Sequence, residues 1–81
     1  MSIEMMHGDS ISDAVQFIVG RAFEKHTPEA MVEAAHKLEG IGTAVRFIYG
    51  SNNFGLTFLI KIANETQRCY RTADLIREGK I

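Results

Sequence analysis

Residues 27–49 read TPEAMVEAAHKLEGIGTAVRFIY, and this stretch decides the fold. Thr27 carries a hydroxyl suited to a helix N-cap, Pro28 suits the first helical position, and Glu29 adds an acidic group to the first turn. The apolar residues that follow recur at alternating spacings, which places them on one helical face. They are Met31, Ala35, Leu38, Gly42, Val45 and Tyr49. The stretch therefore predicts a long helix that begins at Pro28 and packs this face against another helix.

The segments on either side of this stretch supply the partner helices. Apolar residues at helical spacing predict a shorter helix over about residues 11–25. After a break at residues 50–53, a second long helix is expected from Phe54 to about Glu78, with Gly79 as its C-terminal cap. The sequence thus predicts one all-α domain over residues 1–81, made of two long antiparallel helices and a short N-terminal helix.

A second interpretation places a β-hairpin at about residues 43–62. Gly40 and Gly42 disfavour a helix interior, each by about 1 kcal/mol relative to alanine. The segments 43–49 and 54–62 are rich in β-branched and aromatic residues, which favour strands. A turn at residues 50–53 would then join two strands, and Asn64 would cap a final helix. This α+β alternative remains open from the sequence alone.

The first half of the last segment predicts self-association. Phe54, Leu56, Phe58 and Ile60 make it apolar on several sides. A helix of this kind is buried on several sides, and a chain of 81 residues has little material to cover it. Cys69 is the only cysteine, so no disulfide within the chain can compensate for a small core. We therefore expect a homo-oligomer.

Composition and motifs exclude several classes of function. Nine basic and ten acidic residues give a net charge of −1, which argues against a dedicated binder of duplex DNA. No apolar run is long enough to span a membrane, and the start of the chain lacks a secretory signal, so a cytoplasmic location is expected. No nucleophile elbow, glycine-rich phosphate loop or zinc spacing is present. The sequence predicts a non-enzymatic binding protein without cofactor or metal.

Basic residues at two places predict a site for a small anionic ligand. Lys25, His26 and Thr27 stand at the start of the helix from Pro28, where free amides and the helix dipole favour negative charge. Arg68 and Arg71 lie on one side of the last helix and offer guanidinium groups suited to phosphate. We expect these residues to contribute contacts to one ligand, either within a chain or between subunits.

The junction Phe23-Glu24-Lys25-His26-Thr27-Pro28-Glu29 resembles the entry to the helical hairpin of phage anti-CBASS cyclic-nucleotide sponges, a domain shared with some anti-Thoeris proteins. The resemblance covers about residues 23–76. It implies a phage protein that counters host defence by sequestering cyclic nucleotides between its subunits, with Phe23, Lys25, His26 and Thr27 at the site. The chain departs from the pattern at Lys25, where an aromatic residue is frequent, and at Glu39, where a basic residue is expected. It also lacks the tryptophan that is common in the last helix.

Two other functions remain open. One is a protein–protein interaction module that inhibits or recruits another protein. The other comes from Ala35-His36-Lys37-Leu38-Glu39-Gly40, which resembles the helix of histidine phosphotransfer domains. There His36 would accept a phosphoryl group, but Glu39 stands where that family has a lysine. Glu33 and His36 also match one Glu-x-x-His element of di-iron bundles, which needs further carboxylates on facing helices, so we expect a surface pair.

Overall fold

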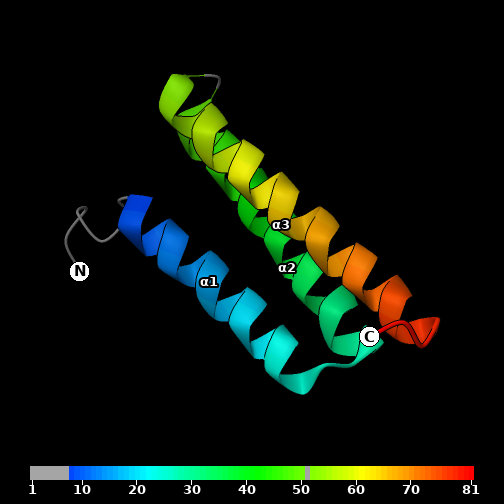
Figure 1. Ribbon diagram of the computed structural model, residues 1–81. Coiled ribbons are helices and arrows are strands. Elements are labelled where there is room, and N and C mark those ends of the chain that lie inside the picture. The colour runs from blue at the N-terminus through cyan, green and yellow to red at the C-terminus, as the bar shows by residue number, and fades with distance from the viewer. Residues whose placement is uncertain (1–7, 51) are drawn as a thin grey trace.

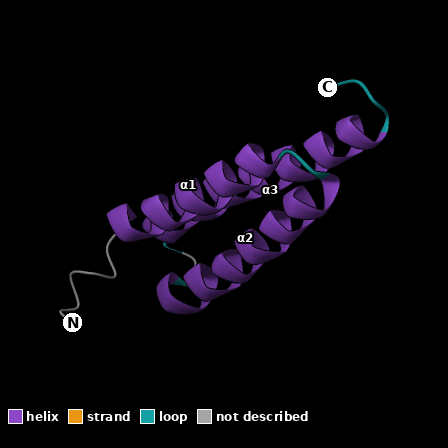
Figure 2. Cartoon of the chain, turned by 90° about the horizontal axis from the view of Figure 1, so that it is seen from below, coloured by secondary structure: helices purple, strands orange, loops and turns teal. Residues whose placement is uncertain are grey.

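The computed structural model describes residues 8–50 and 52–81, which form three helices and no strand. Helix α1 spans Gly8–Lys25, α2 spans Pro28–Tyr49 and α3 spans Asn53–Arg77. Helix α2 runs antiparallel to both of the others (Figure 1). Seen from below, these residues are helical apart from the two connections and the C-terminal end (Figure 2). The all-α prediction is confirmed.

The turn between α1 and α2 forms as the sequence predicts. Thr27 is extended at the N-cap, and its hydroxyl accepts a hydrogen bond from the amide of Ala30 at 3.1 Å. Pro28 occupies the first turn, where its missing amide hydrogen costs nothing. His26 has a φ of 53°, a left-handed conformation that reverses the chain within two residues. The local cap therefore sets where α2 begins.

The predicted alternative of a β-hairpin at residues 43–62 is wrong, because α2 continues to Tyr49 and α3 begins at Asn53. Gly50, at a φ of 63°, ends α2, and its amide donates to the carbonyl of Arg46. Asn52 caps α3 by accepting a hydrogen bond from the amide of Gly55 at 2.8 Å. Both helix ends at the connection thus have backbone partners, and this offsets the weak helix propensity of the flanking residues.

Gly55 allows the two helices to meet closely at this connection. A Cβ atom at Gly55 would lie 2.7 Å from the Cβ of Tyr49, closer than two carbon atoms can pack. At Gly42, by contrast, an added Cβ would make ordinary contact with Ile62 at 3.6 Å. The α2–α3 hairpin therefore depends on a glycine at position 55 and merely tolerates one at position 42.

The core lies along α2, the central helix. Its largest fully buried side chains are Met31 and Leu38 from α2, Val15 from α1 and Cys69 from α3. Several of the remaining core residues are alanines, which let helix backbones approach closely but bury little apolar surface. The molecule is elongated, about 43 × 25 × 14 Å. None of the described helices combines the length and apolar character needed to cross a membrane.

Candidate functional site

Large hydrophobic side chains are exposed at the end of the α2–α3 hairpin. Eight are exposed among the described residues, and five of them belong to residues 47–60. These five are Phe47, Ile48, Phe54, Leu56 and Ile60, and they are called the apolar tip below. Phe47 is 90% exposed, and Ile60 is 62% exposed. A concentration of this kind marks an interaction surface more often than scattered exposed residues do.

The apolar tip carries no charge. Residues 47–60 contain no Asp, Glu, Lys, Arg or His, and Arg46 and Lys61 flank them. The Phe54 ring is held in place by edge-to-face contacts with Tyr49 and Phe58, with ring centroids 5.2 and 5.0 Å apart. The tip is thus an ordered surface on helices. Ile48 also lines an apolar groove of about 200 Å³ between the start of α1 and the end of α2, together with Ile11.

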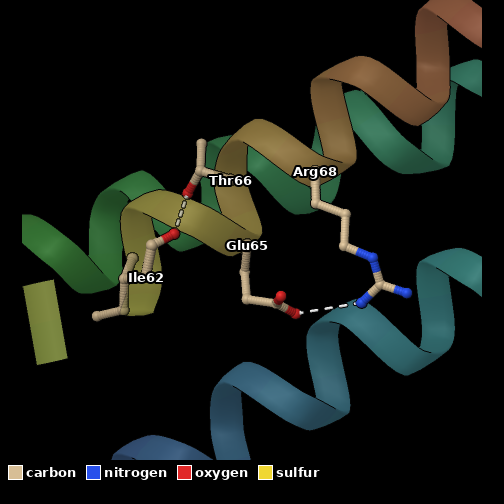
Figure 3. A network of polar contacts seen from close by, with 4 residues as sticks. All are labelled: Ile62, Glu65, Thr66 and Arg68. Atoms are coloured by element: carbon tan, nitrogen blue, oxygen red, sulfur yellow. Dashed lines mark hydrogen bonds and ion pairs between the residues drawn. The ribbon is translucent and has the colours of Figure 1, made fainter. Parts of the chain in front are cut away.

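Two of the predicted ligand-binding residues meet in the structure. The guanidinium carbon of Arg68 on α3 lies 4.6 Å from the centroid of the Phe23 ring on α1. Arg68 also forms an ion pair with Glu65, with Nη1 3.7 Å from Oε2, and its side chain reaches toward α1 (Figure 3). Through these contacts Arg68 joins α3 to α1, and its charge is already partly balanced by Glu65.

The other predicted residues lie elsewhere. Thr27 uses its hydroxyl for the α2 cap, and His26 is exposed in the turn. Arg71 is exposed on α3, three residues after Arg68. Lys25 lies on the opposite side of α1 from Phe23, because two residues correspond to about 200° of helical rotation. The structure therefore brings Phe23 and Arg68 together, whereas Lys25 faces a groove between α1 and α2.

The groove that Lys25 lines lies between α1 and α2 and is called the basic groove below. It encloses about 200 Å³ and is lined by Phe17, Arg21 and Lys25 from α1 and by Glu33 and Lys37 from α2, over a floor of small and branched apolar residues. Lys37 binds Glu33 at 3.1 Å. This hydrogen bond and the charge of Lys37, with Lys25 adding to them, lower the pKa of the Glu33 carboxyl group.

Sequence reasoning found Lys25 but missed its partners. Arg21 and Lys25 are four residues apart and share a helical face, which is a signal the sequence does contain. Phe17, four residues before Arg21, belongs to the same face, whereas Lys37 joins them only through the packing of α1 on α2. The Arg21 guanidinium carbon lies 5.6 Å from the centroid of the Phe17 ring. Phe17 is 64% exposed, so most of this ring remains free beside the groove.

The predicted phosphotransfer residue His36 is exposed on α2, with its ring centroid 6.3 Å from that of Tyr70. The Tyr70 hydroxyl donates to Glu39 Oε1 at 2.8 Å, and this bond raises the pKa of Tyr70. Cys69 is buried, and desolvation raises the pKa of its thiol, with Glu65 adding to the effect. Within the described ranges, no three side chains among His, Cys, Asp and Glu lie together as a metal site would require.

Comparison with protein families, with curated proteins and with solved structures found no match to this chain. The candidate surfaces therefore depend on geometry and chemistry alone. They are the apolar tip and the basic groove.

Proposed function

We propose that this protein is a non-enzymatic binding module that acts as a homo-oligomer joined through the apolar tip. The observation that carries the proposal is the exposure of five large hydrophobic side chains within residues 47–60. Full burial of a fully exposed large apolar side chain contributes about 1.5–3 kcal/mol, and each of these five would contribute in proportion to the area that it still exposes. Self-association recovers part of this free energy.

The size of the apolar tip fits a protein interface. With about 200 Å² for a fully exposed large side chain, the five residues offer on the order of 500 Å² of apolar surface. A standard interface buries about 800 Å² per partner, of which roughly 56–65% is apolar. The two amounts agree. Because Phe47 and Ile48 are adjacent on α2 and point about 100° apart, the tip faces more than one direction, and assemblies larger than a dimer fit it as well.

The absence of charge favours a second copy of the chain as the partner. In a symmetric interface each patch faces the same patch on the other subunit, so a charged patch brings like charges together near the axis. Residues 47–60 avoid this repulsion because they contain no Asp, Glu, Lys, Arg or His. A partner recognised by charge would have little to bind here. The tip is thus suited to pairing with itself.

Light scattering of the purified protein, coupled to size-exclusion chromatography, tests the proposal. The expected mass is at least twice the chain mass of 9.0 kDa. Phe47→Asp and Ile60→Asp, tested singly, should shift the mass toward that of one chain, because each places a carboxylate in the apolar contact. Both positions are exposed, so circular dichroism should show that the variants remain helical.

Ile81→Asp is the matched control. Ile81 is 58% exposed and lies outside the apolar tip, so the same change in charge and apolar area there should leave the mass unchanged. A wild-type mass of about one chain at every concentration would overturn the proposal and place a different protein at the tip. A loss of assembly in Ile81→Asp equal to that in Phe47→Asp would also count against it.

Sequestration of cyclic nucleotides, which the sponge resemblance implies, is a narrower form of this proposal. It requires cationic side chains that are free to meet phosphate, and in the described part of the chain Lys25 is such a group. Native mass spectrometry with and without a panel of cyclic di- and trinucleotides reports assembly and ligand mass together. Assembly without any bound cyclic nucleotide would retain the self-associating module and remove the sponge.

A further inference from the structure

The basic groove concentrates positive charge although the chain as a whole has a small net negative charge. Arg21, Lys25 and Lys37 contribute three cations against the single carboxylate of Glu33, a net local charge of +2, whereas the whole chain has a net charge of −1. Within residues 8–50 and 52–81, neither Arg21 nor Lys25 forms an ion pair with a carboxylate at close range. The lowered pKa of Glu33 reflects the same positive surroundings.

The ion pair within the groove does not block it. Lys37 and Glu33 are neighbours on one helix and both side chains are well exposed, so their pairing is weak and readily exchanged for a stronger anion. A phosphate group carries more charge than a carboxylate and offers several oxygens to guanidinium and ammonium donors. The groove is therefore better matched to phosphate than to its own carboxylate.

The exposed Phe17 ring gives the groove a second recognition element. It lines the groove together with Arg21, whose guanidinium lies over its ring, and most of its surface is exposed. Flat aromatic groups of nucleotides stack on such rings and on guanidinium planes. The groove volume of about 200 Å³ is below the roughly 300 Å³ at which pockets begin to enclose a whole small ligand. The groove is therefore suited to the phosphate group of a nucleotide, with the base lying outside it.

We propose that the basic groove binds a nucleotide, with the phosphate among Arg21, Lys25 and Lys37 and the base against Phe17. The site differs from the one expected from the sequence, because Arg68 and Arg71 lie outside it. The inference does not depend on self-association, since every residue of the groove belongs to one chain.

Amide-detected NMR titration of the full chain tests the site. Adenosine, guanosine, cytidine and uridine 5′-monophosphates serve as probes, with inorganic phosphate and adenosine as partial ligands, all at fixed ionic strength. We expect at least one nucleotide to bind more tightly than either partial ligand. The shifted amides should cluster between residues 17 and 37, on the two helices that line the groove.

Four variants locate the contacts. Arg21→Gln and Lys25→Gln should each weaken nucleotide and phosphate binding about tenfold or more, the usual effect of removing a charged hydrogen bond. Phe17→Ala should weaken nucleotide binding about fivefold or more and leave phosphate binding unchanged, because only stacking is lost. Arg71→Gln makes the same charge change on exposed α3 and should alter binding less than twofold.

Two outcomes would contradict a nucleotide site in the basic groove. Binding of no nucleotide above the level of inorganic phosphate and adenosine removes the nucleotide site. Equal losses in Arg71→Gln and Lys25→Gln show nonspecific attraction to the chain as a whole. All four positions are exposed, and Lys25→Arg should restore binding, so a folding defect is distinguishable from a lost contact.

Discussion

The guanidinium group of Arg68 lies over the ring of Phe23, with its central carbon 4.6 Å from the ring centroid, and this contact joins α3 to α1. Helix α1 otherwise packs mainly on α2, so the pair supplies one of the side-chain contacts between the first and last helices. A second such contact is the hydrogen bond from Lys61 Nζ to Ser12 Oγ at 3.1 Å, near the other end of α1.

Replacing Arg68 with methionine should lower the free energy of unfolding by about 0.5–1 kcal/mol, because it removes a partly exposed cation–π contact but keeps an apolar stem. Arg71→Met, on the same helix and exposed, should change it by less. Urea denaturation at fixed protein concentration measures both, since self-association would make stability depend on concentration. Equal effects at positions 68 and 71 would mean that the Phe23 contact contributes nothing.

Gly55→Ala should lower the free energy of unfolding by about 1–3 kcal/mol, the range for forcing an extra methyl group into a packed contact. The new Cβ would lie 2.7 Å from the Cβ of Tyr49 unless the hairpin opens. Gly40→Ala is the matched control, because nothing lies within 4 Å of its added Cβ. This control should raise stability by about 0.5–1 kcal/mol, as alanine favours a helix interior. Thermal denaturation should show the two variants moving in opposite directions.

Cys69 should make the protein less stable in alkaline solution. Burial raises the pKa of its thiol above the ordinary value for a cysteine. The unfolded chain therefore loses this proton at a lower pH than the folded chain does. The contribution of the protonated thiol to the free energy of unfolding is complete at pH values below the pKa of the thiol in the unfolded chain. It is lost as the pH rises toward the pKa of the thiol in the folded chain.

Urea denaturation between pH 7 and 10 measures this dependence, and Cys69→Ala should flatten part of it. Tyr70, whose pKa is also raised, contributes a decline in the same direction that Cys69→Ala leaves in place. The native thiol should also react slowly with a thiol-specific reagent and rapidly once urea unfolds the chain. Fast labelling of the folded protein would contradict the buried position of Cys69.

His36 should not hold a phosphoryl group. Glu39, one helical turn away, carries a negative charge that opposes the added phosphate, and it is held in place by the hydroxyl of Tyr70. Incubation with a small-molecule phosphodonor, followed by detection of acid-labile phosphate, checks this expectation. Stable label on wild type that is absent from His36→Gln would instead support the phosphotransfer function.

Much of the fold was readable from local signals. The hydroxyl of Thr27, the ring of Pro28 and the apolar spacing from Met31 to Tyr49 each act within a few residues, so they mark α2 without knowledge of its neighbours. The segment 43–62 was ambiguous because its residues favour strands by propensity. It became helical because both ends at the connection are capped and because Val45 and Ile62 are buried at helical positions.

The candidate sites divide in the same way. Exposure of Phe54, Leu56 and Ile60 was expected from a segment that is apolar on several sides in a short chain, whereas the share of Phe47 and Ile48 on α2 appeared only in the structure. The basic groove was decided by tertiary structure. Phe23 and Lys25 are two residues apart, yet helical rotation sends one toward Arg68 on α3 and the other toward Lys37 on α2. Spacing along a chain fixes which residues share a helical face, but only the packing of helices decides which face each one meets.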